Sequence, residues 1–143
     1  MLNQSYDLEF DWFGIDKNHQ VAIFSTFNRG YIPRDFFNSL GEFQKLQSII
    51  NSLSLNSQAK QITKYVGDFS DWLRYSTKGL YAYDYQDIHR STKMNEYDII
   101  SIPEKPLLLL ENLELKNMMP VLPKFNLIFG ENISFENLKQ SLI

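Results

Sequence analysis

Residues 7–27 read DLEFDWFGIDKNHQVAIFSTF, and the fold can be worked out from this stretch. Acidic and apolar side chains alternate from Asp7 to Trp12, which is the two-residue period of a strand with one buried and one exposed face. Residues 21–24, VAIF, are apolar without alternation, as in a strand that is covered on both faces. We therefore predict two strands folded back on each other, with the return strand inside the sheet.

The turn between these strands is Asp16-Lys17-Asn18-His19. Asp and Asn suit a turn because their side chains bond nearby backbone groups and tolerate left-handed geometry. The fourth position of such a turn often needs a positive φ, which glycine adopts most easily. We predict that Asn18 or His19 has a positive φ. His19 is expected to be an exposed turn residue, with a catalytic or ligand-binding imidazole as the alternative.

The composition indicates a single globular domain over residues 1–143 with a full hydrophobic core. Phe, Tyr and Trp number 11, 8 and 2, and such residues both fill cores and serve at binding surfaces. The net charge of −3 disfavours a nucleic-acid partner, which needs a basic face. No apolar run approaches the roughly 20 residues of a membrane span, so no membrane partner is expected. The absence of cysteine excludes disulfides and thiolate sites and fits a cytoplasmic location.

The rest of the chain predicts an α+β domain. Apolar residues recur every three to four positions in two stretches, which predicts helices over 34–53 and from Ser57 to Lys78, with Gly79 as the stop. Strands are predicted over 80–85, 97–102, 107–110 and 125–129, and a helix capped by Ser134 over 135–142. The expected architecture is a mostly antiparallel β-sheet with a pair of antiparallel helices packed on one face and the other face partly open.

No sequence motif indicates a particular enzymatic reaction. Asp84, Asp87 and His89 form the only cluster of acids with an imidazole. In a rigid loop they would ligate a metal, or Asp87 would orient His89 as a base, but the spacing matches no established ligand signature. A small metal-dependent or acid/base hydrolase centred on these residues is therefore an alternative, and the expectation is a protein without enzymatic activity or cofactor.

The best candidate contact surface is the strand face that carries Tyr81, Tyr83 and Tyr85, flanked by Asp84 and Asp87. Tyrosines bury a large area at low entropic cost and keep a hydroxyl for hydrogen bonding. Seven acids against three bases between residues 79 and 115 make this region acidic. The competing interpretation is that these tyrosines fill the core and that the charges are an ordinary solvated face.

Two stretches resemble small bacterial proteins, some of them immunity proteins of toxin systems. The first is DWFGID at 11–16 with VAIF at 21–24 and GYIP at 30–33; the second is GLYAYD at 79–84, followed by Ile102-Pro103 and Pro106-Leu107. They cover about a third of the chain and carry no catalytic signature. The resemblance implies a cytoplasmic protein that blocks a cognate toxin by binding it.

The leading hypothesis is thus a non-enzymatic, immunity-type protein that occludes a protein toxin with a basic active-site cleft. The expected contact residues are acids and tyrosines of two strand regions: Tyr81, Tyr83, Asp84, Tyr85, Asp87, Asp7, Glu9 and Asp11. Two alternatives remain open: the hydrolase, and a ligand-binding or scaffold domain with an apolar cleft between helices and sheet.

Overall fold

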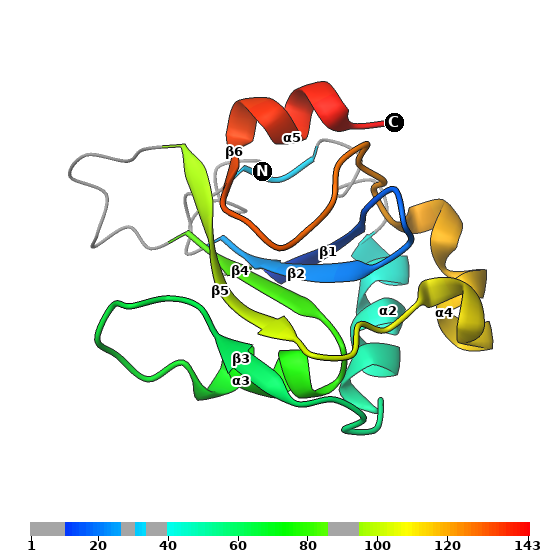
Figure 1. The fold of residues 1–143 in the computed structure, drawn as a ribbon. Coiled ribbons are helices and arrows are strands. Elements are labelled where there is room, and N and C mark those ends of the chain that lie inside the picture. Colours follow the sequence, from blue (N-terminus) through cyan, green and yellow to red (C-terminus); the bar gives the residue numbers. More distant parts are fainter. Residues whose placement is uncertain (1–10, 27–30, 34–39, 86–94) are drawn as a thin grey trace.

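A computed structural model of the chain describes residues 11–26, 31–33, 40–85 and 95–143 (Figure 1). Its strands are β1 (Asp11–Ile15), β2 (Val21–Ser25), β3 (Ala59–Gln61), β4 (Tyr81–Asp84), β5 (Glu96–Pro103) and β6 (Ile133–Ser134). Its helices are α2 (Leu40–Asn51), α3 (Ser70–Thr77), α4 (Leu113–Asn117) and α5 (Phe135–Ser141), with 3₁₀ turns η3 (Leu109–Glu111) and η4 (Met119–Val121). The α+β class is as predicted.

The strands form one mixed, mostly antiparallel sheet in the order β1-β2-β4-β5-β3, with β6 paired to β5. Only β2 and β4 run parallel among the described strands, and the connection between them carries α2, β3 and α3. Because β2 pairs with both β1 and β4, the prediction that the return strand lies inside the sheet is confirmed.

The predicted hairpin is present, with β1 and β2 paired from Asp11 and Ser25 to Ile15 and Val21. His19 has φ 60°, which confirms the prediction of a left-handed residue in this turn. The buried Asp16 carboxylate organises the turn, because it accepts hydrogen bonds from the backbone N–H groups of Asn18 and Gln20, both at 2.9 Å. The same carboxylate accepts a third bond, from Phe129, and so attaches the hairpin to the C-terminal part of the chain.

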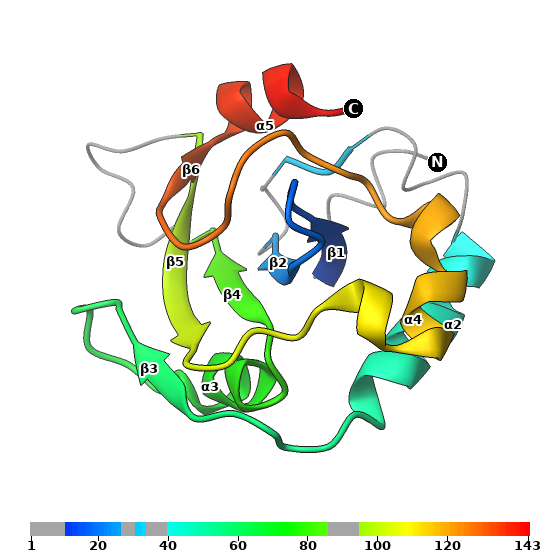
Figure 2. The ribbon, with the colours of Figure 1, turned by 45° about the vertical axis from the view of Figure 1, so that its right-hand side comes forward.

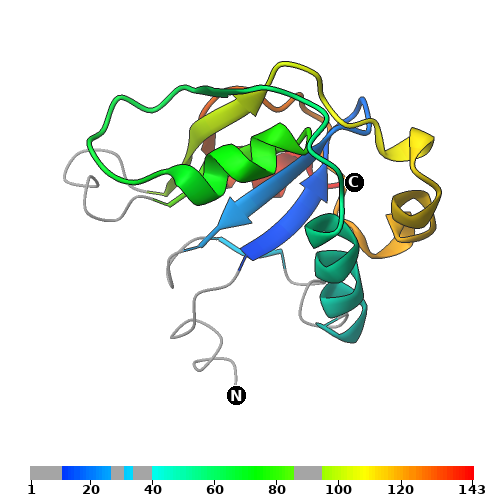
Figure 3. The same cartoon turned by 90° about the horizontal axis from the view of Figure 1, so that it is seen from below.

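Helices α2 and α3 lie on one face of the sheet (Figure 3). Leu46 and Ile50 of α2 pack with Trp72 and Tyr75 of α3 over the apolar side chains of β1, β2 and β4. Figure 3 shows the two helices running in different directions across this face, not side by side. The expected antiparallel pair rested on a short connecting loop, whereas β3 and a further loop separate α2 from α3.

The other face of the sheet is covered as well, which corrects the expectation that it is partly open. The chain from Leu122 onward crosses this face and ends in α5 (Figure 2). It brings apolar side chains onto the aromatic residues of the strands: Phe125, Phe129, Ile133, Phe135 and Leu138. Trp12 stacks on Phe24 at 4.1 Å between ring centroids, so this second layer is a dense aromatic core.

The prediction of one helix from Ser57 to Lys78 is wrong in its first half. Residues 59–61 form β3, which pairs with β5 from Ala59–Pro103 to Gln61–Ser101. Helix α3 begins only at Ser70. Val66, which was expected on the apolar helix face, is 98% exposed. The helical spacing of apolar residues was therefore coincidental there, and pairing with a strand 40 residues later decided the structure. The expected stop at Gly79 is confirmed by its φ of 97°.

Other differences between the predicted and observed elements are smaller. Residues 107–110 are not a strand, because Leu109 turns into the core as the start of η3 while Leu108 and Leu110 stay exposed. Residues 125–129 contribute only an isolated bridge from Phe125. The strands at 81–84 and 96–103 are present, and Ser134 caps α5 by accepting a bond from the Asn137 N–H, as predicted. No helix in the described part of the chain is long and apolar enough to span a bilayer.

Candidate binding site

The tyrosines of β4 were expected to form an exposed contact face, and the structure corrects this. Tyr83 is fully buried and Tyr85 is 5% exposed, while Tyr81 keeps intermediate exposure. Tyr83 stacks on Phe24 and meets Phe129 edge-on, and Tyr85 packs against Phe135. Both side chains face the C-terminal layer, the segment from Leu122 onward. The sequence did not show that this segment covers that face of the sheet.

The Tyr83 hydroxyl explains why a tyrosine is tolerated at the centre of the core. It donates to the carbonyl of Glu131 and accepts from the N–H of Gly130, both at 2.9 Å. The hydroxyl thereby bonds two backbone groups of the covering segment and ties that segment to β4. Tyr97 does the same for the carbonyl of Tyr31, at 2.7 Å.

The buried tyrosines predict a loss of stability at alkaline pH. Burial raises the pKa values of Tyr83 and Tyr97, whereas tyrosine in the unfolded chain ionises near pH 10. Above about pH 10 the unfolded state therefore holds fewer protons, and the free energy of unfolding falls by about 1.4 kcal/mol per pH unit for each buried tyrosine. Urea titrations between pH 8 and 11 measure this. The stability of the Tyr83→Phe variant should be lower at pH 8 and should fall less steeply with rising pH than that of the original chain; an unchanged slope would contradict the assignment.

A row of carboxylates crosses one end of the sheet. Asp11 pairs with Ser25, Ser25 with Asp84, and Asp84 with Asp98, so these side chains share the helix-covered face. Asp84 and Asp98 are each 7% exposed and have interaction partners, while Asp11 keeps intermediate exposure. Of the other expected site residues, Asp7, Glu9, Asp87 and His89 lie outside the described residues.

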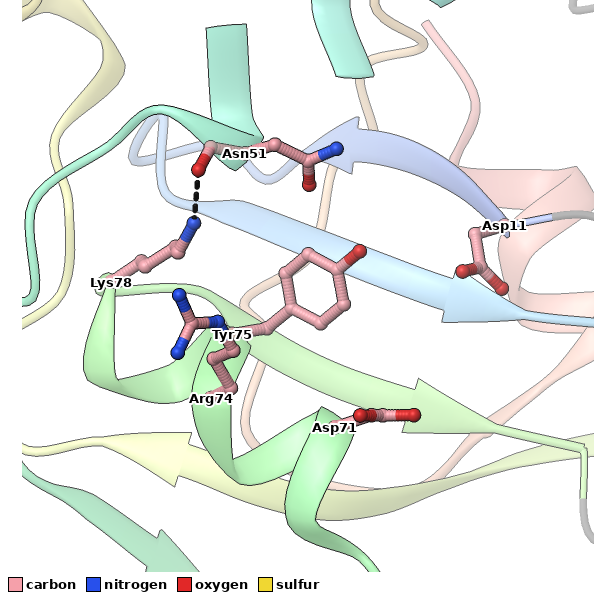
Figure 4. A pocket seen from close by; sticks show the side chains of 6 residues that line it. All are labelled: Asp11, Asn51, Asp71, Arg74, Tyr75 and Lys78. Carbon is pink, nitrogen blue, oxygen red and sulfur yellow. Dashed lines mark hydrogen bonds between the residues drawn. The ribbon is translucent and has the colours of Figure 1, made fainter. Parts of the chain in front are cut away.

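A groove of about 180 Å³ opens beside the exposed end of this row (Figure 4). Its lining comes from the start of β1, the end of α2, and α3 with the residue that follows it: Asp11, Asn51, Asp71, Arg74, Tyr75 and Lys78. Asp71 and Arg74 are exposed, Tyr75 is half-buried and Lys78 is 5% exposed. The groove therefore has a charged rim and an aromatic wall.

The charges of the groove are separated. Burial raises the pKa of Tyr75, and the nearby carboxylates of Asp11 and Asp71 raise it further. Burial lowers the pKa of Lys78, with a smaller contribution from Arg74. Figure 4 accordingly shows the two carboxylates on one side of the Tyr75 ring and the two basic side chains on the other.

The Lys78 ammonium is hydrogen-bonded to the backbone of α2. It donates to the carbonyl of Asn51 at 2.7 Å, at the C-terminus of α2 (Figure 4). It also donates to the carbonyl of Ile50 at 3.1 Å. A cation at this end of a helix is favourable because it meets unpaired carbonyls and the negative end of the helix dipole. Lys78 thus links the end of α3 to the end of α2 at one side of the groove.

Sequence reasoning missed this groove, although a signal was present. Asp71, Arg74, Tyr75 and Lys78 are spaced as i, i+3, i+4 and i+7, which places them on one side of a helix. No role was predicted for this side. Its contact with Asp11, 60 residues earlier, depends on the tertiary structure.

Within the described residues, no three or more His, Asp or Glu side chains are grouped as a metal site would require. The hydrolase alternative is not tested by this, since Asp87 and His89 lie outside that part of the chain. No known family model matches the sequence, and comparisons with curated proteins and with solved structures found no similar protein.

Proposed function

We propose that the chain is a non-enzymatic binding protein of the toxin-immunity type. It acts in the cytoplasm and neutralises a cognate protein toxin by occluding a basic cleft. The contact region is the acidic edge, where Asp71 of α3 and Asp11 of β1 are accessible to a partner. Asp84 and Asp98 of the sheet belong to the same edge, but they are buried and lie behind the contact surface. The tyrosine face that the sequence suggested is not part of this proposal, because Tyr83 and Tyr85 are buried.

The observation that carries the proposal is the line of three strand carboxylates continued by Asp71. Cross-strand pairing puts Asp11, Asp84 and Asp98 in one row, although they are up to 87 residues apart in the chain. Asp71 stands exposed beside Asp11, and both act on the Tyr75 hydroxyl. Charges of one sign gathered at one edge attract a partner of the opposite sign and speed its association.

The test uses the protein encoded by the gene adjacent to this one as the candidate toxin. We expect the chain to bind it and to restore growth of cells that produce it. Asp71→Lys should weaken binding about tenfold at low salt and make the affinity less dependent on salt, because a favourable long-range charge becomes repulsive.

Glu104→Lys is the matched control. Glu104 is also exposed and the charge change is the same, but it follows β5 at the end opposite to Asp98. The affinity of the Glu104→Lys variant for the candidate toxin should stay within about twofold of that of the original chain. Equal losses for the two variants would argue against the acidic edge. Absence of both binding and growth rescue would refute the proposed function for this pair of proteins.

A further inference from the structure

The groove beside the acidic edge is a candidate anchor site because of its size. Its volume of about 180 Å³ is well below the range of about 300–1,000 Å³ that is usual for pockets holding cofactors or drug-sized ligands. A space of this size suits a single side chain. Partner proteins often place one arginine or aromatic residue in such a pocket, where it contributes much of the binding energy.

The carboxylate side of the groove selects a cation. Asp71 is exposed, and it makes no hydrogen bond or ion pair with any other residue in the described part of the chain. Asp11 adds a second negative charge from β1, and the Tyr75 hydroxyl experiences both. A cationic group that enters here therefore meets two carboxylates from different elements, and one of them, Asp71, has no competing partner among the described residues.

The basic side of the groove limits what enters. Lys78 is held by two carbonyls of α2, so its ammonium does not bridge to the acids. Arg74 lies beside Lys78, on the far side of the Tyr75 ring from Asp71 (Figure 4). These two positive charges disfavour a second cation and leave one place, next to the carboxylates, for a single cationic group.

The aromatic wall favours a guanidinium over an ammonium. The half-buried Tyr75 ring borders the space, and its inner edge rests on Phe13, with ring centroids 6.5 Å apart. A guanidinium is planar and weakly hydrated, stacks on aromatic faces and bonds two carboxylates at once. An ammonium is compact and strongly hydrated, and it gains less from such a wall.

We infer that the groove formed by Asp11, Asp71, Arg74, Tyr75 and Lys78 binds one arginine side chain of the partner protein and is the anchor of the interface. This inference rests on the proposed function. It adds the chemical class of the residue that is recognised and the place where it binds.

The first experiment needs no partner. The full chain, labelled with ¹⁵N, is titrated with arginine blocked at both ends, and with blocked citrulline, which has the same shape without the charge. We expect saturable changes in the amide signals of residues 11–14 and 71–78 with arginine only. Asp71→Asn should weaken this binding about fivefold, and Glu104→Gln should leave it unchanged. Equal responses to arginine and citrulline, or no response, would overturn the inference.

Two variants of Tyr75 separate the ring from the hydroxyl. Tyr75→Phe keeps the wall and should retain arginine binding within about twofold, whereas Tyr75→Leu should lose most of it. Circular dichroism and the melting temperature check that both variants fold. If the Tyr75→Leu variant binds blocked arginine as tightly as the original chain, the Tyr75 ring does not form a wall of the binding site.

The candidate toxin then distinguishes the inference from the proposed function. If the toxin binds the original chain, and if Asp71→Asn and Tyr75→Leu both weaken this binding, the groove is the anchor. If it binds both variants unchanged and blocked arginine gives no response, the groove inference falls and the proposed function stands. If the toxin does not bind but blocked arginine does, the groove remains a guanidinium site and the proposed function falls.

Discussion

Replacing Asp16 with asparagine is expected to lower the free energy of unfolding by about 3 kcal/mol. The carboxylate is fully buried and accepts three backbone hydrogen bonds, two on Oδ1 from Asn18 and Gln20 and one on Oδ2 from Phe129. An asparagine keeps one oxygen, so its NH₂ group must face an N–H donor. At least one buried N–H then loses its partner, and the others lose a charge-assisted bond.

Urea denaturation followed by tryptophan fluorescence measures this loss. Asp68→Asn is the control, because Asp68 also accepts a backbone hydrogen bond, from Ser70, but is exposed to solvent. Its effect should be much smaller, since water replaces the lost bond. Equal losses for the two variants would show that the Asp16 carboxylate does not hold the hairpin to the C-terminal layer.

Gly79→Ala is expected to be about as damaging, at about 3 kcal/mol. Gly79 has φ 97°, a backbone angle that residues other than glycine rarely adopt. A Cβ placed there would lie 2.6 Å from the backbone nitrogen and 2.8 Å from the Cβ of Leu107. That nitrogen donates to the Gly79 carbonyl, so the two segments cannot separate without breaking a hydrogen bond.

Gly41→Ala is the matched control with the opposite sign. Gly41 lies in α2, and nothing is within 4 Å of its added Cβ. Alanine there should raise stability by about 0.5 kcal/mol, because it reduces the freedom of the unfolded chain and favours the helix. Thermal or urea unfolding of the two variants gives the difference. A Gly79→Ala protein as stable as the original chain would contradict the close approach to Leu107.

The sequence by itself determined the features that near neighbours control. The DKNH turn places His19 at φ 60°, Gly79 ends a helix with φ 97°, and Ser134 caps α5. In each case a side chain, or its absence, acts on backbone groups within a few residues. Local chemistry of this kind needs no knowledge of what covers the element, and the hairpin, the strands at 81–84 and 96–103 and the α+β class followed from it.

Only the tertiary structure decided which faces are covered and which distant groups meet. Residues 59–61 pair with β5 against their helical spacing, and the C-terminal layer buries Tyr83 and Tyr85 on a face that looked open. Asp71 and Asp11 line the same groove because β1 and α3, distant in the chain, both border it. The physical reason is that a periodic pattern shows which side chains share a face, whereas burial depends on the surface that packs against it.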